Sequence, residues 1–415
     1  MKTIKYHIVI VGAGSAGTAA AVSAAQSGLK VLLVEKNEYG GGKATAAEVG
    51  TICGLFHQQK KAESNWLVQG YAREFAEKLV KSPEAKVRHN ADGLHFVPYQ
   101  VADFRQLVSD ELDRARVDVW YDTKMVEVRC EHELIKHVIV SQSDQIITIE
   151  ADAFIDCSDD AQVCQFAGIS MIRDDTFQAA ARVFTLSGMP SIEEHAVQLV
   201  LWRAIYKGVQ LGEIPSSLLK VYPVPGSMVG DKMSFKYAIP MEVNHLPDNY
   251  SQLKKYSEQA IHELILYLQK HTDVFNTLIL ETISDEVGIR TGLRPKGKTV
   301  LTGTQIVKGQ KWESGIAKCA WPIEEWCVED AVKMTYLAEG NYYEIPLECL
   351  VTAEISNLFF AGRNISADKE AIASARVMGA CLQTGYAAGI LASSYCQGTP
   401  NSIALQIIQK MQILS

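Results

Sequence analysis

The sequence predicts an α/β fold with a doubly wound parallel sheet, into which a separate α+β lobe is inserted. Two regions carry this prediction. Near the N-terminus, residues 6–11 and 29–34 are apolar and β-branched, as in strands buried on both faces, and the small residues 18–27 between them predict a helix. Near the C-terminus, an apolar strand at 358–361 precedes a long helix at 374–394. Both regions have the strand–helix order of a doubly wound sheet.

The middle of the chain has a different pattern. Strand-like residues 181–186 and 232–239 are mixed with helical residues 194–207 and 250–271, which is typical of an α+β arrangement. We therefore expect three segments. They are 1–175 and 286–415, which together form the doubly wound domain, and 176–285, an inserted substrate or cap lobe.

The remaining elements follow from hydrophobic periodicity and from turn residues. Apolar residues at helical spacing predict helices, short β-branched runs predict strands, and residues 141–145 predict a hairpin turn. The expected helices are at 64–82 and 101–116, and the expected strands are at 94–97, 117–121, 125–130 and 153–157.

Charge and composition exclude several classes of function. The net charge of −8 is the wrong sign for a nucleic-acid-binding surface, and no apolar run approaches the roughly 18–20 residues of a membrane span. Residues 6–11 belong to the fold, so we expect no signal peptide there. The nine scattered cysteines include no CxxC pair, which favours reduced thiols in the cytoplasm over a disulfide framework or a metal site. We expect a cytoplasmic protein with a small-molecule substrate; the sequence does not indicate an oligomeric state.

A glycine-rich turn joins the first strand to the first helix. Gly12 permits the tight turn, Gly14 lets the backbone approach a pyrophosphate, and Gly17 allows the helix to pack closely on the strand. The helix N-terminus offers free N–H groups and partial positive charge to phosphates. The sequence therefore predicts a Rossmann-like dinucleotide site. Its phosphate-side residues are Gly12, Gly14, Ser15, Ala16 and Gly17.

An acid ends the second strand. Glu35 is placed to accept hydrogen bonds from ribose hydroxyls, and its charge disfavours a 2′-phosphate, so NADP is not expected. A second glycine-rich segment follows at 40–45. The succession of glycine turn, acid and GGxxT resembles the N-terminal signature of FAD-dependent oxidoreductases of the glutathione-reductase-like superfamily. This resemblance implies that FAD is the cofactor and that the second glycine loop lies along its pyrophosphate and flavin. The implied contacts are Lys36, Gly41, Gly42, Lys43, Ala44 and Thr45.

The C-terminal region gives an independent resemblance. Residues 357–363 (NLFFAGR), 365–367, 373–378 and 384–389 resemble the closing motif of the "FAD dependent oxidoreductase" family. The resemblance implies that the strand ending at Gly362 passes the ribityl chain, and that a helix beginning near Ser374 points its N-terminus at the flavin N1–C2 edge. A helix N-terminus there stabilises the negative charge of reduced flavin. The implied contacts are Gly362, Arg363, Ser374, Arg376, Val377 and Met378.

Three further segments fit the same family. Met125 lies where the family's adenine-contacting residue lies, although an ordinary strand residue explains it nearly as well. Residues 153–161 resemble the family's strand that ends near the cofactor, with Ser158 as a contact and Asp160 at the family's acidic position. Asp159 stands where the family usually has glycine, which leaves the backbone less room to approach the cofactor. Residues 287–294, followed by 300–302, resemble the family's strand with paired arginines.

The candidates for reacting groups are few. Arg290 and Arg294 lie four residues apart, so on a strand they share a face, and arginine clamps a carboxylate or stabilises an oxyanion. Salt bridges to Asp285 or Glu286 are an equally good explanation. His57 is a candidate proton donor or flavin tether. The alternative is that it is an ordinary loop residue that only packs against its neighbours. The same alternatives hold for Cys53, and Trp321 and Trp326 either line a substrate pocket or pack in the core.

The resulting hypothesis is an FAD-dependent oxidoreductase that transfers hydride between flavin N5 and a small organic substrate. Residues 1–175 and 286–415 form its FAD-binding domain. One alternative is a flavin monooxygenase or halogenase, but these usually have Gly-Asp after the late strand, where this chain has Gly362-Arg363. The other alternative is a flavoprotein that binds FAD without turnover of its own.

Overall fold

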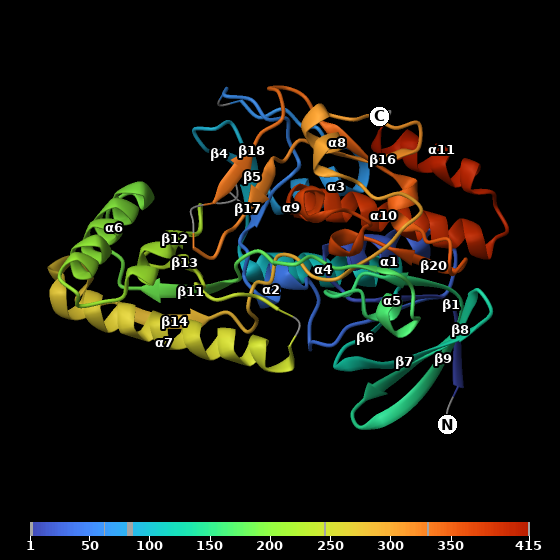
Figure 1. Cartoon of the computed structure of the whole chain (residues 1–415), viewed down its shortest axis with the longest axis horizontal. Coiled ribbons are helices and arrows are strands. Elements are labelled where there is room, and N and C mark those ends of the chain that lie inside the picture. The colour runs from blue at the N-terminus through green and yellow to red at the C-terminus, as the bar shows by residue number, and fades with distance from the viewer. Residues whose placement is uncertain (1–2, 62, 81–85, 245, 330–331, 414–415) are drawn as a thin grey trace.

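The computed structural model describes residues 3–61, 63–80, 86–244, 246–329 and 332–413. A larger part holds both ends of the chain, and a smaller lobe extends to one side of it (Figure 1). Among the described residues, none of the helices combines the length and apolar character needed to cross a membrane.

A seven-stranded sheet forms the centre of the larger part. Its parallel strands are β6 (Asp118–Trp120), β2 (Val31–Val34), β1 (Thr3–Val11), β9 (Gln145–Asp156) and β20 (Leu358–Phe360), in that order. The antiparallel strands β8 (Leu134–Gln142) and β7 (Thr123–Glu131) continue the sheet from the first half of β9, whereas β20 pairs with its last residues. The parallel core confirms the predicted α/β fold.

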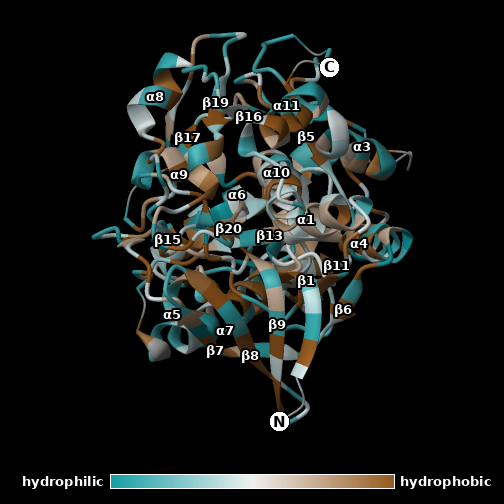
Figure 2. Cartoon of the chain, turned by 90° about the vertical axis from the view of Figure 1, so that its right-hand side faces the viewer, coloured by the Kyte–Doolittle hydropathy of each residue, from teal (hydrophilic) through white to brown (hydrophobic). Residues whose placement is uncertain are grey.

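Two helices rich in small residues lie side by side over this sheet, as Figure 1 and Figure 2 both show. They are α1 (Ser15–Gln26) and α10 (Met378–Cys396), and nearly every residue of α10 is buried. Ser23 of α1 donates a hydrogen bond of 2.9 Å to the backbone carbonyl of Tyr386 in α10. The small side chains allow this close approach, which brings the last hundred residues against the first strand–helix unit.

The rest of the larger part consists of short elements. The helices are α2 (Lys43–Ala46), α3 (Gly70–Leu79), α4 (Val101–Ala115), α5 (Gln162–Phe166), α8 (Gly303–Lys308), α9 (Lys369–Ala375) and α11 (Asn401–Gln412). The strands are β3 (Thr51–Ile52), β4 (Arg88–His89), β5 (His95–Pro98), β10 (Met171–Ile172), β15 (Arg294–Pro295), β16 (Gly315–Cys319), β17 (Ile323–Glu325), β18 (Lys333–Thr335) and β19 (Tyr343–Pro346). Single 3₁₀ turns are η3 (Leu347–Leu350) and η4 (Gly362–Asn364) here, and η1 (Ser216–Lys220) and η2 (Asp273–Phe275) in the smaller lobe.

The smaller lobe has its own sheet and its own core. Its antiparallel strands run in the order β12 (Val221–Pro223), β13 (Met233–Ala238), β11 (Ala181–Ser187) and β14 (Ile279–Ile283). The helices α6 (Glu194–Gln210) and α7 (Pro247–His271) pack on this sheet (Figure 1). Phe184, Phe235 and Leu268 are among the fully buried residues of this core, which is separate from those of the larger part.

Several predicted elements differ from the structure. The helix expected over 64–82 spans Gly70–Leu79, and residues 81–82 of that prediction lie outside the described residues. Helix α1 begins at Ser15 rather than residue 18, because the glycine turn ends at Gly14. The helix expected over 374–394 is broken into α9 and α10, and α10 begins only at Met378. The strand expected over 287–294 is wrong. Its backbone makes a single bridge, from Gly288 to Ala181, and only β15 at its end is a strand.

Candidate functional site

A cavity of about 650 Å³ lies where the parallel strands end. It is lined by the ends of β1 and β2, by the residues after β9 and β20, and by Ala181, Val183 and Lys236 of the smaller lobe. In open α/β sheets, ligands bind in the crevice outside the carboxyl ends of the strands. The cavity therefore lies where the fold itself directs a ligand.

The first glycine turn forms one wall. Gly12 has φ +97°, and a Cβ at this position would lie 2.5 Å from the backbone oxygen of Cys157. A Cβ on Gly17 would lie 1.7 Å from the oxygen of Gly12, so Gly17 lies behind the turn, where α1 meets the strand. Gly12, Gly14, Ser15 and Ala16 line the cavity. The N-terminus of α1 therefore opens into it.

The second glycine segment faces the first. Gly41 N donates to Ala13 O at 2.7 Å, and a Cβ on Gly42 would lie 2.9 Å from Gly14 Cα. Gly42 has φ +54° and ψ −131°, which glycine adopts readily and other residues rarely do. Thr45 lies outside the cavity and donates to Gly40 O at 2.9 Å, which holds the loop from behind. The two glycine segments thus form a cradle of exposed backbone, with Lys43 and Ala44 at its edge.

Glu35 lies at one end of the cavity, beside the first glycine turn. Its side chain is buried, with Oε2 accepting from Ala13 N at 2.7 Å and Oε1 from Asn37 N at 3.0 Å. Burial raises the pKa of the Glu35 carboxyl, and the two amide hydrogen bonds oppose that rise. Each oxygen retains acceptor capacity for a hydroxyl group. Met125, after the start of β7, lines the same end.

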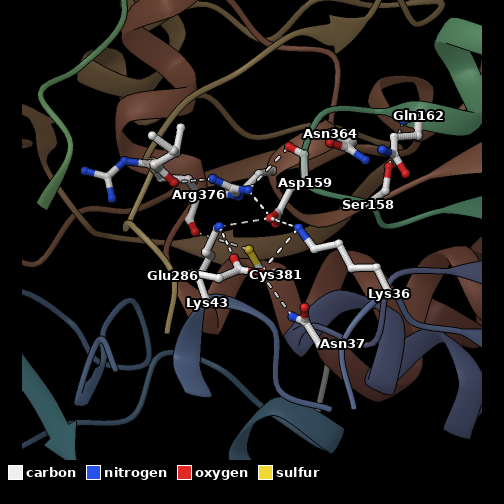
Figure 3. Close-up of polar contacts among 12 residues, drawn as sticks. Lys36, Asn37, Lys43, Ser158, Asp159, Gln162, Glu286, Asn364, Arg376 and Cys381 are labelled. Carbon is white, nitrogen blue, oxygen red and sulfur yellow. Dashed lines mark hydrogen bonds and ion pairs between the residues drawn. The ribbon is translucent and has the colours of Figure 1, made fainter. Parts of the chain in front are cut away.

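A network of charges lies beside the cradle (Figure 3). Asp159 Oδ2 is 3.1 Å from Lys43 Nζ and 3.5 Å from Lys36 Nζ, and its Oδ1 accepts from Arg363 Nη2 at 2.6 Å. Glu286, which lies in the segment after β14, forms ion pairs with both lysines. Burial would raise the pKa of Asp159, but Lys43, Arg363 and Lys36 outweigh it and hold that pKa well below its usual range. Three cations and two carboxylates therefore meet beside the glycine backbone.

The segments after β9 and β20 complete this wall. The buried carboxylate of Asp156 accepts hydrogen bonds from Ser158 N, Ser158 Oγ and Cys164 N, which fixes the turn after β9. Ser158 and Asp160 line the cavity, as do Gly362 and Arg363 after β20. Asp156 is absent from the sequence hypothesis, because an acid at a strand end has no signal that separates it from a surface acid.

The N-terminus of α10 reaches the cavity at a different residue than the sequence suggests. Val377 is the N-cap of α10, and Arg376, Val377 and Met378 line the cavity. Ser374 does not, because it lies in the preceding helix α9, where its Oγ donates to Trp321 O at 2.5 Å. The predicted cavity contact of Ser374 is therefore corrected, and the helix terminus lies four residues further on.

Aromatic and cationic side chains line the other end of the cavity. The Arg290 guanidinium lies 4.1 Å from the centre of the Trp326 ring, and the Lys236 ammonium lies 4.4 Å from it. The Glu324 carboxylate accepts from Trp326 Nε1 and Trp321 Nε1, both at 2.9 Å. All five side chains line the cavity, so both tryptophans lie at the pocket. Lys236 and Glu324 are absent from the sequence hypothesis, because they lie on separate short strands without a motif.

Arg294 and His57, predicted as catalytic residues, lie outside the cavity. Arg294 is fully buried, and its guanidinium binds Asp174, Ala367 O and Gly292 O. The expected shared face with Arg290 does not exist, because residues 287–293 are not a strand. The His57 ring lies 6.0 Å from the Tyr342 ring, and burial lowers its pKa. Cys53 does line the cavity, as a free thiol whose pKa burial raises to about 12.

These residues fit the FAD that the sequence resemblance implies. The glycine cradle has room for a pyrophosphate only because no Cβ fills it, and Lys43 and Arg363 supply cations beside it. Glu35 offers acceptors for ribose, and the α10 N-terminus offers amide groups further along the same cavity. Cavities of this size are typical of sites for small molecules and cofactors.

Comparison with known proteins agrees with this fit. A digeranylgeranylglycerophospholipid reductase of Methanothrix thermoacetophila is 31% identical over 173 residues, which is 40% of this chain and 42% of that protein. A second such reductase, from Methanopyrus kandleri, is 29% identical over 134 residues, which is 32% of this chain and 29% of that protein. The matches span less than half the length of these relatives.

A solved structure and a family model cover far more of the chain. The geranylgeranyl bacteriochlorophyll reductase-like protein of Thermoplasma acidophilum has a TM-score of 0.52 and 12% identity, over 98% of this chain and 83% of that chain, which supports the fold. The family model described as "FAD dependent oxidoreductase" matches residues 7–412. Because that match covers nearly the whole chain, and because the cavity fits the cofactor, this protein belongs to the FAD-dependent oxidoreductase family and is an FAD enzyme.

Proposed function

We propose that this protein transfers a hydride between flavin N5 of FAD and a small organic substrate. The observation that carries the proposal is the continuity of one cavity, from the glycine cradle past the α10 N-terminus to the Arg290–Trp326 cluster. When bound, FAD supplies the hydride donor or acceptor at N5. The chain's own residues bind the cofactor, orient the substrate and exclude water.

In this proposal, residues 1–175 and 286–415 hold FAD, and the lobe at 176–285 covers the substrate. The cradle of Gly12, Gly14 and Gly42 takes the pyrophosphate, and Lys43 and Arg363 neutralise its charge. Lys36 supports Lys43 through their shared partners Asp159 and Glu286. Because Glu286 comes from the segment that leaves the smaller lobe, cofactor binding and lobe position are linked through one ion network.

At the other end, Val377 and Met378 present the N-terminus of α10 to the ring system. The partial positive charge of a helix N-terminus stabilises negative charge on a nearby group, and this effect favours the reduced state of a flavin. Gly379 N donates to Cys53 O at 2.9 Å, so the segment after β3 is tied to the same helix end. Cys53 and Val377 both line the cavity at this point.

Replacing Glu35 by Ala is expected to weaken FAD binding by about 10- to 100-fold, the usual effect of losing hydrogen bonds to a charged group. The reason is that Glu35 both offers acceptors to ribose and fixes Ala13 N in the glycine turn. The dissociation constant of FAD from reconstituted apoprotein measures the change. Glu38→Ala, at an exposed acid three residues away, is the matched control. Equal FAD affinity in both variants would remove Glu35 from the site.

The hydride-transfer proposal is tested with reduced holoenzyme under anaerobic conditions. Two relatives are named reductases, so the reduced flavin is offered first to unsaturated and carbonyl compounds. Return of the visible absorption of oxidised flavin, with one reduced product per flavin, supports the proposal. Reoxidation that requires dioxygen and yields a hydroxylated or halogenated product supports a monooxygenase or halogenase instead. A flavin that no compound reoxidises contradicts independent turnover.

A further inference from the structure

We propose that the substrate carries a carboxylate, and that Arg290, Lys236 and Arg376 bind this group at the end of the cavity beside the smaller lobe. This inference rests on the proposed function, because it names the substrate class of that same site. It goes beyond a single arginine clamp by assigning a three-cation site built from β13, the segment before β15 and the residue that precedes the N-cap of α10.

The first step is the arrangement around Trp326. Arg290 and Lys236 both lie over its ring, at 4.1 Å and 4.4 Å from the ring centre. Arg290 is anchored further by a hydrogen bond from Nη1 to Ala179 O, and Ala179 N donates to Trp326 O at 2.8 Å. The ring therefore contacts Lys236 from the smaller lobe and Arg290 from the segment before β15. A cation–π contact attracts a cation but leaves its charge available to an anion.

The second step is the balance of charge. Among the described residues, neither Arg290 nor Lys236 has a carboxylate oxygen within 4.0 Å. Glu324 is the acid of this cluster, and its two oxygens accept from the indole N–H groups of Trp321 and Trp326. Its distance to Arg376 Nη2 is 3.8 Å. Three cations thus surround one carboxylate that is already bound, which leaves an excess of positive charge in the cavity.

The third step is the response of these groups to each other. Burial, and then the nearby Arg290, lower the pKa of Lys236 to about 8. Burial and Arg376 lower the pKa of Arg290, whose guanidinium remains charged at neutral pH. Buried like charges cost free energy until an anion is placed among them. A substrate carboxylate supplies that anion, and arginine is suited to bind it with two parallel hydrogen bonds.

The fourth step is position. Arg376 immediately precedes Val377, the N-cap of α10, and its Nη2 also contacts Gln178 Oε1 at 3.3 Å. Its Nε is buried and makes no hydrogen bond within the described part of the chain. Cys53, Val377 and Met378 line the same stretch of cavity. A carboxylate held here places the rest of a small substrate next to the helix end that we assign to the flavin ring.

The experiment titrates oxidised holoenzyme with benzoate, cinnamate and succinate, each paired with its neutral amide, and follows the flavin absorption spectrum. We expect each carboxylate that binds to do so at least about 10-fold more tightly than its amide, as for a hydrogen bond to a charged group. Arg290→Gln and Lys236→Met should each reduce this preference. Lys333→Met, at an exposed lysine of β18, should keep it and serves as the control.

The inference is overturned if amides bind as tightly as carboxylates, if no carboxylate perturbs the spectrum, or if the preference survives in both variants. A changed flavin reduction potential in Arg290→Gln without any carboxylate preference also overturns it, because the cations then act on the flavin. Hydride transfer to a neutral compound distinguishes failure of the carboxylate inference from failure of the proposed hydride-transfer function. If it persists, only the substrate class is wrong, whereas its absence contradicts the proposed function.

Carboxylate binding should also weaken as the pH rises through about 8. Lys236 has a lowered pKa, so its charged form is fully present below that pH and is lost above it. Glu324, Arg290, Arg376 and Cys53 face Lys236. Burial and the nearby Glu324 raise the pKa of Cys53 to about 12, so Cys53 stays a thiol in this range. The dissociation constant of the carboxylate that binds most tightly is measured from about pH 6 to about pH 9.5, which gives the pH dependence of binding. In Lys236→Met the decline near pH 8 should disappear, and a decline that persists there would assign it to another group.

Discussion

Gly42→Ala is expected to give a folded protein that does not retain FAD. The backbone of Gly42 has φ +54° and ψ −131°, and a Cβ there would lie 2.9 Å from Gly14 Cα. The atoms nearest to that Cβ are Gly14 Cα at 2.9 Å and Gly14 N at 3.5 Å. Because both belong to the backbone, no side chain can rotate away to make room. The loop must move, and the cradle for the pyrophosphate is lost with it. Visible flavin absorption after gel filtration, together with a urea unfolding curve, measures both parts of this prediction.

Gly168→Ala is the matched control for that variant. Gly168 also has a positive φ, of +73°, but no atom lies within 4 Å of the added Cβ. This substitution carries a backbone cost on the order of 1–2 kcal/mol without filling the cradle. We expect it to keep its FAD. If Gly42→Ala retains FAD as tightly as Gly168→Ala does, the pyrophosphate does not lie between the two glycine segments.

Arg294→Met is expected to lower the free energy of unfolding by about 3–5 kcal/mol, the usual cost of removing one partner of a buried ion pair. Arg294 is fully buried, and it binds Asp174 Oδ1 at 2.7 Å, Ala367 O at 2.8 Å and Gly292 O at 2.7 Å. Methionine fills the space but leaves these acceptors without a donor. Chemical denaturation measures the loss, and flavin reoxidation per folded molecule should remain unchanged.

Arg129→Met provides the comparison for a surface pair. Arg129 is exposed and pairs with Glu127 at 2.7 Å, so its loss should cost less than about 1 kcal/mol. An Arg294→Met protein that is as stable as this control, but no longer transfers hydride, would restore Arg294 to the catalytic residues. The opposite result assigns it to the scaffold that joins the segment before β15 to the loop before α9.

The fold was predictable from sequence where local chemistry determines it. Residues 6–11 and 29–34 are apolar except for His7 and Lys30, and beside a glycine turn this pattern indicates a strand buried on both faces. The start of α10 was not predictable to the residue. Residues 373–380 contain no proline that would end a helix, and tertiary contacts such as Gly379 N to Cys53 O set the break between α9 and α10.

The candidate site divides in the same way. Gly12, Gly42 and Glu35 belong to motifs in which the residue types themselves indicate the backbone conformation and the ligand contact. Lys236 and Glu324 come from strands of different sheets that meet only after folding, and no spacing in the sequence relates them. Arg294 was wrongly assigned to the site. Side chains alternate with a period of two only in a strand, and residues 287–293 do not form a strand.

The most direct measurement is the visible absorption spectrum of the purified protein, followed by identification of the cofactor that denaturation releases. If the glycine cradle and the α10 N-terminus hold FAD as we describe, the protein has an oxidised-flavin spectrum, bleaches on anaerobic reduction and releases FAD rather than a shorter flavin. A colourless protein that cannot be reconstituted with FAD would contradict it.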